Sequence, residues 1–245
     1  MTKLSGPAYL LRGYQLMLEP GIRRFVVIPL LINIALFTAA AVIGYQQFSQ
    51  LMGWLLGYLP SWLAWLQYLL WPVFAFTAIL ILFFTFSTLA NLVGAPFNGL
   101  LAEAVENHLA GNPVPSASSW KKMLAGAIPA ILSELRKMSY YLIRVIPLLI
   151  LFLIPGINII APFLWALFTA WMYALEYLDY PMDNHDILFR EMKQRLRKQR
   201  ILSLGFGGSV LLATMIPFLN FLIMPAAVCG ASTMWVERFS IPATD

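Results

Sequence analysis

Charged side chains and cysteine are both scarce in this chain of 245 residues. Asp, Glu, Lys and Arg make up 11% of it, where about 25% is usual for a soluble domain. Cys229 is the single cysteine, which excludes an internal disulfide framework and a zinc site built from cysteines. Apolar residues make up 60% and the mean hydropathy is +0.77, more than a soluble domain of this length can bury. The composition therefore predicts an integral membrane protein and excludes a soluble enzyme or a disordered chain.

Three long stretches carry no Asp, Glu, Lys or Arg: residues 25–102, 145–175 and 201–236. A charge at the bilayer centre costs about 2.5–3.5 kcal/mol on insertion scales, so these stretches are expected inside the membrane. The first one is long enough for two spans of about 20 residues each. We predict transmembrane helices at 25–44 and 73–93.

The segment between these two spans, residues 45–72, is uncharged and rich in aromatic residues. They include Trp54, Tyr58, Trp62, Trp65, Tyr68 and Trp71. Trp and Tyr favour the membrane–water interface, so we predict a helix or helix pair lying on the far membrane face. Residues 1–20 are predicted to form a short interfacial helix before the first span.

The second and third uncharged stretches share the motif I-P-x-(I/L)-N-x-(I/L), at residues 154–160 and 216–222. Proline interrupts a helix and asparagine tolerates turn conformations. Each hairpin would have two arms of about 12–16 residues, or about 18–24 Å at the helical rise. Arms of this length enter a bilayer without easily crossing it, so we predict re-entrant helical hairpins over 142–175 and 201–236. Two kinked single spans are the alternative. The predicted fold class is all-α: two full transmembrane helices, two partly penetrating hairpins and amphipathic interfacial helices.

The basic residues predict the topology. All 16 Lys and Arg residues precede the first span or follow the second, and the loop between the spans has none. The positive-inside rule makes the side that carries these residues cytoplasmic, so both termini and the basic linker of this multi-pass protein are expected on the cytoplasmic side of the membrane. Kinked single spans would place that linker outside, against the same rule.

The linker at residues 184–200 is predicted to be a basic amphipathic helix capped by Asp183. Leu188, Met192 and Leu196 form an apolar stripe at i, i+4 spacing, and the other face is basic. Such a helix lies on anionic lipid headgroups. The net charge of +5 therefore needs no nucleic-acid partner.

The sharpest candidate site is Pro20-Gly21-Ile22-Arg23-Arg24, at the start of the first predicted span. A helix start offers free backbone N–H groups and a positive dipole end, and two guanidinium groups stand beside it. Together these groups would bind an oxyanion. The alternative is that Arg23 and Arg24 only anchor the helix among the headgroups.

A second candidate region follows the second span, where Pro96 is expected to kink or break the helix. Glu103 and Glu106 then lie on one helix face at i, i+3, where they could pair with Arg residues or move protons. The alternative is a solvated acidic face. Asparagines in the apolar segments could line a pathway or bond between helices; these are Asn33, Asn91, Asn158 and Asn220.

Enzyme and metal chemistry have little support in the sequence. His185 has acidic neighbours, but capping of the basic helix explains them more simply, and His108 stands alone. The chain contains no G-x-S-x-G, H-E-x-x-H, phosphate-loop or dinucleotide fingerprint. We therefore expect no enzymatic activity, no cofactor and no metal site.

Five runs of sequence carry a resemblance over nearly the whole chain. They are P-G-I-R-R-F at 20–25, A-P-F-N-G-L-L-A-E at 95–103, I-P-G-I-N at 154–158, D-Y-P-M-D-N-H at 179–185 and M-P-A-A-V-C-G-A at 224–231. In these runs and their order the chain resembles the bacterial CysZ family of inner-membrane sulfate transporters.

The resemblance implies uptake of sulfate for assimilation into cysteine, by a helical homo-oligomer in a proton-dependent manner. It also implies that Gly21, Ile22, Arg23 and Arg24 bind the sulfate. The expected partners are thus sulfate, anionic lipid and further copies of the chain. A membrane regulator or scaffold that senses cytoplasmic oxyanion without transporting it is the alternative function.

Overall fold

A computed structural model describes residues 4–58, 65, 67–112 and 127–240, without the side chains of 56, 67, 70, 81–96, 127–136, 217, 218 and 221. The described residues are helical and contain no strand, as the sequence predicted. The chain forms two compact units: Val27–Phe97, and Met1–Val26 together with Asn98–Asp245.

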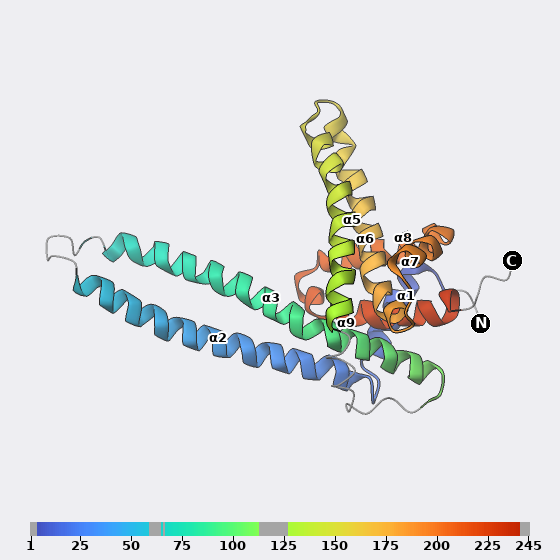
Figure 1. The fold of residues 1–245 in the computed structure, drawn as a ribbon, viewed down its shortest axis with the longest axis horizontal. Helices are drawn as coiled ribbons and strands as arrows, with labels where there is room; N and C mark the ends of the chain where they lie inside the picture. Colours follow the sequence, from blue (N-terminus) through green and yellow to red (C-terminus); the bar gives the residue numbers. More distant parts are fainter. Residues whose placement is uncertain (1–3, 59–64, 66, 113–126, 241–245) are drawn as a thin grey trace. The chain divides into compact units, whose positions relative to one another are not determined.

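The smaller unit is an antiparallel helix pair from α2 (Arg23–Gly57) and α3 (Gln67–Leu109) (Figure 1). The ring of Phe48 on α2 meets that of Trp71 on α3, edge to face, with centroids 5.1 Å apart. At 1.5 Å per residue, 35-residue α2 is about 50 Å long, against a hydrocarbon core of about 30 Å. Helices α2 and α3 therefore continue into the aromatic segment 45–72. The described part of this segment forms the end of α2 and the start of α3.

One helix in the described part of the chain is long and apolar enough to cross a membrane. It spans Arg23–Leu55, and its most apolar window has a mean hydropathy of 2.6 with none of the window buried inside the protein. The predicted span 73–93 falls within α3, but most of its side chains lie outside the described set. Pro96 does not break α3, which runs on to Leu109, so the expected break is wrong, and the expected kink stays a prediction. Proline removes one hydrogen bond, and a helix in an apolar setting tolerates it when other groups satisfy the freed carbonyl.

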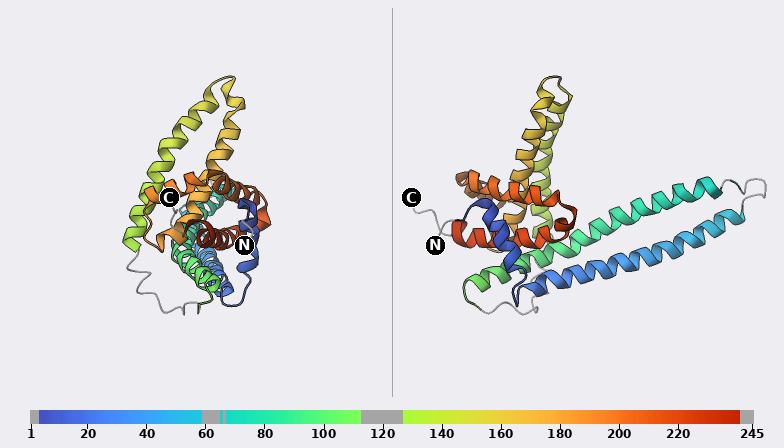
Figure 2. Two further views of the ribbon diagram at one scale, coloured as in Figure 1. Left: turned by 90° about the vertical axis from the view of Figure 1, so that its right-hand side faces the viewer. Right: turned by 180° about the vertical axis from the view of Figure 1, so that it is seen from behind.

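The larger unit is a bundle in which α1 (Gly6–Leu16), α8 (Arg200–Thr214) and α9 (Pro217–Met234) pack with α6 (Ala161–Asp183) (Figure 2). Glycine permits the closest approaches. A Cβ added to Gly13 would lie 1.9 Å from the carbonyl oxygen of Ala226. A Cβ added to Gly207 would lie 1.8 Å from that of Ala170. Backbone meets backbone at both crossings, which is typical of small residues in membrane helix packing.

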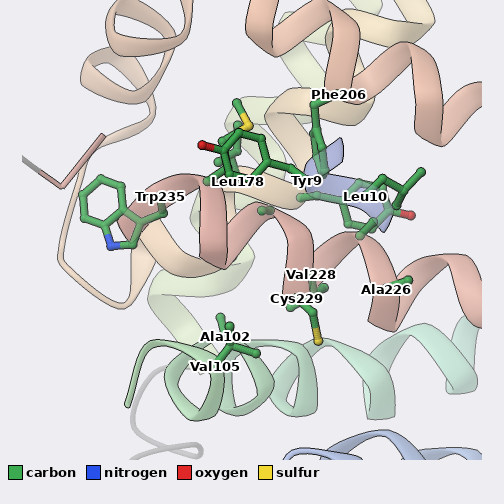
Figure 3. Close-up of a cluster of buried hydrophobic side chains, with 14 of the residues drawn as sticks. Tyr9, Leu10, Ala102, Val105, Leu178, Phe206, Ala226, Val228, Cys229 and Trp235 are labelled. Atoms are coloured by element: carbon green, nitrogen blue, oxygen red, sulfur yellow. The ribbon is translucent and has the colours of Figure 1, made fainter. Parts of the chain in front are cut away.

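The residues of α1 enter the core of this unit. Tyr9 is fully buried, and its hydroxyl donates to Oε2 of Glu237 at 2.8 Å, which ties the N-terminal helix to the end of the chain. Figure 3 shows Ala102 and Val105 of α3 in the same buried cluster, beside Cys229 of α9. The apolar side of the predicted interfacial helix is thus largely covered by protein, and Leu18 remains 70% exposed.

A helix–turn–helix lies at each predicted hairpin. The first runs from α5 (Ala127–Leu153) through η2 (Ile157–Ile159) into α6, and the second runs from α8 into α9. The amide of Asn158 donates to the carbonyl of Ile154, and that of Asn220 to the carbonyl of Ile216, each at 3.0 Å. The repeated motif therefore makes the same backbone bond at both turns.

Two features of these turns could not be set from the motif alone. Gly156 has a φ of 84°, a left-handed conformation that favours glycine. Helices α5 and α6 are longer than the predicted arms, because charged residues outside the apolar stretch extend a helix as readily as apolar ones.

The basic linker forms α7 (Phe189–Lys198), and the chain's last described turn is the π-helix η3 (Trp235–Phe239). Asp183 is the last residue of α6 and Leu188 is the N-cap of α7, so the predicted cap is wrong. Met192 and Leu196 are fully buried in the core, whereas Leu188 is 68% exposed. The apolar stripe of α7 therefore packs mainly on protein, and its basic face points outward.

Candidate functional site

The Arg pair follows a tight turn closed by the backbone of Glu19. Gly21 adopts a φ of 93°, which a residue with a side chain rarely adopts. The carbonyl of Glu19 accepts hydrogen bonds from the amides of Ile22 at 3.2 Å and Arg23 at 3.1 Å. Ile22 is fully buried and Phe25 is 6% exposed. The turn is thus held by its backbone and by two buried side chains on either side of the arginines.

These bonds change the donor set that the sequence suggested. The amides of Ile22 and Arg23 bond to Glu19, and the amide of Phe25 donates to the Ile22 carbonyl at 2.9 Å. The expectation of free N–H groups is wrong for these three residues, because the chain folds back before the helix begins. The guanidinium groups and the helix dipole remain to attract an anion.

The two arginines have different surroundings. Arg23 is exposed. Arg24 is half-buried, and its guanidinium carbon lies 4.9 Å from the centroid of the Phe25 ring. A cation over an aromatic face is stabilised and held in place. Arg24 is therefore the more fixed of the two cations and Arg23 the more accessible.

The carboxylate nearest in sequence to the Arg pair belongs to Glu19, and it is directed to a histidine. Its Oε2 lies 3.3 Å from Nε2 of His108, near the end of α3. A carboxylate four and five residues before two arginines would otherwise compete with an incoming anion for them. His108, which the sequence left without a role, holds this competing group.

The acidic face of α3 meets the loop after α6. Nε2 of His185 lies 2.6 Å from Oε2 of Glu106, and the side-chain amide of Asn184 donates to the Gly99 carbonyl at 2.9 Å. Two of the runs that carry the family resemblance, 95–103 and 179–185, thus dock on each other through Gly99 and Asn184. Sequence reasoning missed these contacts, since nothing in either run alone indicates its partner.

Burial sets the protonation preference of this cluster. Desolvation raises the pKa of Glu106 above its usual value, the contact with His185 opposes the shift, and the charge of Glu103 adds to it. The imidazole of His185 also lies against the Trp235 ring, with centroids 5.2 Å apart. A buried carboxyl that keeps a proton more readily than usual is suited to proton exchange.

The other predicted residues are spread over several elements. Asn158 and Asn220 are exposed at the two helix turns. Asn33 lies on α2, and its Oδ1 is buried with no hydrogen-bond partner among the described residues. The side chain of Asn91 lies outside the described set.

The acidic neighbours of His185 have separate roles. Asp179 binds Lys137 of α5 at 2.8 Å, and both side chains are buried. Asp183 closes α6. In the described part of the chain no group of three or more His, Cys, Asp or Glu side chains is placed to hold a metal ion.

An unburied apolar helix with two arginines in its first turn, joined to a glycine-packed helical bundle, defines the class: a helical membrane protein with a cationic cluster at one end of a long apolar helix. A family model described as Sulfate transporter CysZ/Etoposide-induced protein 2.4 matches residues 9–225. The chain belongs to this family.

Individual members agree with the family model over nearly the full length. Sulfate transporter CysZ of Pectobacterium atrosepticum is 46% identical over 240 residues, covering 96% of this chain and 86% of the relative. The protein of the same name from Pseudomonas aeruginosa is 45% identical over 238 residues, covering 97% of both chains. That of Pseudomonas fluorescens is 47% identical over 235 residues, covering 96% of this chain and 94% of the relative.

Proposed function

We propose that this protein takes up sulfate across the bacterial inner membrane and supplies it for cysteine biosynthesis. The observation that carries the proposal is the Arg23–Arg24 pair in the first turn of α2, in a chain whose relatives are named sulfate transporters. Transport also fits the absence of sequence motifs for enzymatic catalysis.

The proposed topology has α2 and α3 crossing the membrane, with α5–α6 and α8–α9 entering it partway. Both termini and α7 then face the cytoplasm. The outward apolar side chains of α5 support this arrangement, among them Ile146 at 55% and Ile150 at 51% exposure. Lipid or a further copy of the chain would cover them, in line with the proposed homo-oligomer.

The proposed sulfate site consists of Gly21, Ile22, Arg23 and Arg24. Sulfate is costly to desolvate without fixed donors, and a guanidinium group offers planar paired donors that match two oxygens. Gly21 and Ile22 shape the turn, and Arg24 is braced on Phe25. His108 holds the Glu19 carboxylate at 3.3 Å, which lessens its competition with the anion for the arginines.

A proton-linked role is proposed for Glu106, with Glu103 beside it. Burial favours its protonated form, so Glu106 holds a proton more readily than an exposed carboxyl does. Asn33, Asn91, Asn158 and Asn220 are proposed as polar groups along the pathway, where membrane-embedded amides bond to a solute or between helices.

Sulfate uptake into proteoliposomes tests the proposal, with and without an imposed pH gradient. Arg23→Ala together with Arg24→Ala should lower sulfate affinity at least tenfold. An exposed charge alone contributes less than about 1 kcal/mol, or roughly fivefold. Lys3→Ala with Arg12→Ala is the matched control, since it removes two positive charges from the same flank.

Each outcome decides between two functions. Uptake that depends on the Arg pair supports a transporter, and dependence on the gradient supports proton linkage. Sulfate binding without uptake would instead support a regulator that senses cytoplasmic oxyanion. Unchanged affinity in the well-inserted double variant would remove the Arg pair from the site.

A further inference from the structure

A second cationic site lies away from the Arg pair, between α5 and α7. It is an open pocket of about 500 Å³. Its lining residues are Tyr140, Ile143 and Arg144 from α5, and Leu188, Phe189, Arg190 and Lys193 from the start of α7. The spacing i, i+3, i+4 places the α5 residues on one helix face, and Phe189 and Lys193 share a face of α7 at i, i+4.

The aromatic rings hold the cations at the pocket. The guanidinium carbon of Arg144 lies 3.6 Å from the Tyr140 ring centroid, and Nζ of Lys193 lies 4.7 Å from it. Lys193 is equally far from the ring of Phe189, which meets Tyr140 edge to face at 5.5 Å. Trp171 of α6 fixes Tyr140 by donating from Nε1 to its hydroxyl at 3.1 Å.

The pocket has an excess of positive charge. Within the described residues, no carboxylate lies within 4 Å of the cationic groups of Arg144, Arg190 or Lys193. Desolvation first, and then the charges of Arg144, Arg197 and Arg190, lower the pKa of Lys193. Like charges held together in this way favour a bound anion, which would relieve their repulsion.

The rim of the pocket is apolar and exposed. Ile143 is 69% exposed and Leu188 is 68% exposed. Beyond Ile143, α5 continues with outward Ile146, Leu149 and Ile150, each about half exposed. A cationic pocket at the foot of an apolar helix face matches a ligand that has an anionic head and a hydrocarbon tail. A free inorganic oxyanion would not use the rim.

We propose that this pocket binds the phosphate of an anionic phospholipid, with Arg144, Arg190 and Lys193 around the headgroup and an acyl chain along Ile143 and the outer face of α5. The site would hold one lipid at a defined place, beyond the general attraction of a basic helix to a membrane surface. It rests on the proposed membrane position of α5–α6, but not on sulfate transport or on Arg23 and Arg24.

Binding of short-chain lipids to the full-length protein in neutral detergent tests this site directly. Dihexanoyl phosphatidylglycerol should bind at least tenfold more tightly than dihexanoyl phosphatidylcholine, as measured by native mass spectrometry. Arg144→Gln with Lys193→Gln should abolish that preference. Lys198→Gln with Arg200→Gln removes two exposed charges outside the pocket lining, and it should leave the preference intact.

Two further arms separate lipid from inorganic anion. Ile143→Ser with Leu188→Ser keeps every charge, and it should weaken phosphatidylglycerol binding severalfold if the rim contacts the tail. Equal binding of both lipids, or an unchanged affinity in the Arg144/Lys193 variant, would overturn the site. If millimolar sodium sulfate displaces the lipid and the rim variant has no effect, the lipid proposal is overturned. The pocket would then be a site for an inorganic oxyanion. Loss of sulfate uptake in the Arg23/Arg24 variant without a change in lipid binding would show that the two sites are separate.

Discussion

Nε2 of His185 lies 2.6 Å from Oε2 of Glu106, which joins the C-terminal part of α3 to the turn between α6 and α7. The carboxylate is 16% exposed and the imidazole 49%, so the pair is only partly screened by solvent. The His185–Glu106 contact links two residues that are 79 positions apart in the chain. The Asn184–Gly99 hydrogen bond lies beside it. The protonation state of the His185–Glu106 pair should therefore affect both stability and function.

Glu106→Gln should remove a pH dependence of stability. Burial raises the folded-state pKa of Glu106 above the ordinary glutamate value of 4.5, so the folded protein binds more protons than the unfolded chain in the window just above pH 4.5. The contribution of Glu106 is therefore full below that value and is lost as pH rises through the folded-state pKa. Thermal unfolding in detergent between pH 4.5 and 7.5 should show a smaller decline in the variant.

Glu103→Gln is the control for this experiment, since Glu103 lies one turn earlier on the same helix. It should keep most of the pH-dependent decline. If the Glu106 variant declines as steeply as the wild type, the titrating group lies elsewhere.

Lys137→Met should strongly destabilise the α5–α6 pair. Nζ of Lys137 lies 2.8 Å from Oδ2 of Asp179, and the side chains are 7% and 14% exposed. Removing one partner breaks a largely buried ion pair, and such a loss costs about 3–5 kcal/mol. The melting temperature of the purified protein should fall well below that of the wild type.

The double variant Lys137→Met with Asp179→Leu is the informative comparison. It removes both charges and should recover much of the lost stability, because a well-packed apolar pair is often no worse than a buried ion pair. A double variant less stable than either single variant would contradict this account.

The sequence predicted the parts of the fold that depend on local chemistry. Uncharged stretches mark the apolar helices, and the I-P-x-(I/L)-N-x-(I/L) repeat marks two turns in which the Asn158 and Asn220 amides make equivalent bonds. Both signals come from residues close together in the chain. Helix ends were harder to predict, since α5 and α6 continue through charged residues and α3 continues through Pro96.

The candidate site could be predicted only in part for the same reason. The motif Pro20–Arg24 located a turn and two cations, but the return of Ile22 and Arg23 amides to Glu19 depends on the turn geometry. The partners of Glu19 and Glu106, which are His108 and His185, lie far away in sequence. Pairing of this kind is set by tertiary packing, and a single sequence carries no signal for it.

Gly13→Val should loosen the crossing of α1 and α9. A Cβ at this position would lie 1.9 Å from the Ala226 carbonyl oxygen, and backbone cannot move aside as a flexible side chain can. Overpacking of a core costs about 1–3 kcal/mol, which lowers a melting temperature by roughly 2–4 °C per kcal/mol in a chain of this size.

Gly53→Ala provides the contrast. A Cβ at Gly53, within α2, meets no atom within 4 Å. Alanine also favours a helix by about 0.5–1 kcal/mol over glycine. This variant should therefore melt at or slightly above the wild-type temperature, and a drop as large as that of Gly13→Val would argue against specific packing at the α1–α9 crossing.

Cysteine labelling should place α7 on the cytoplasmic side. Cys229 is the single cysteine, so Cys229→Ala gives a background that does not react with a membrane-impermeant maleimide. Cys229 is fully buried, which also slows its own reaction. A cysteine at Lys198, which is exposed on the basic face of α7, should react in inside-out vesicles and stay unlabelled in right-side-out cells. Labelling of Lys198→Cys from the outside would mean that 142–175 crosses the membrane completely, and the re-entrant arrangement would then have to be abandoned.

A cysteine at Asn158 reports how deeply the turn between α5 and α6 enters the membrane. An embedded turn reacts slowly from both sides, whereas the turn of a fully crossing hairpin reacts rapidly from the outside.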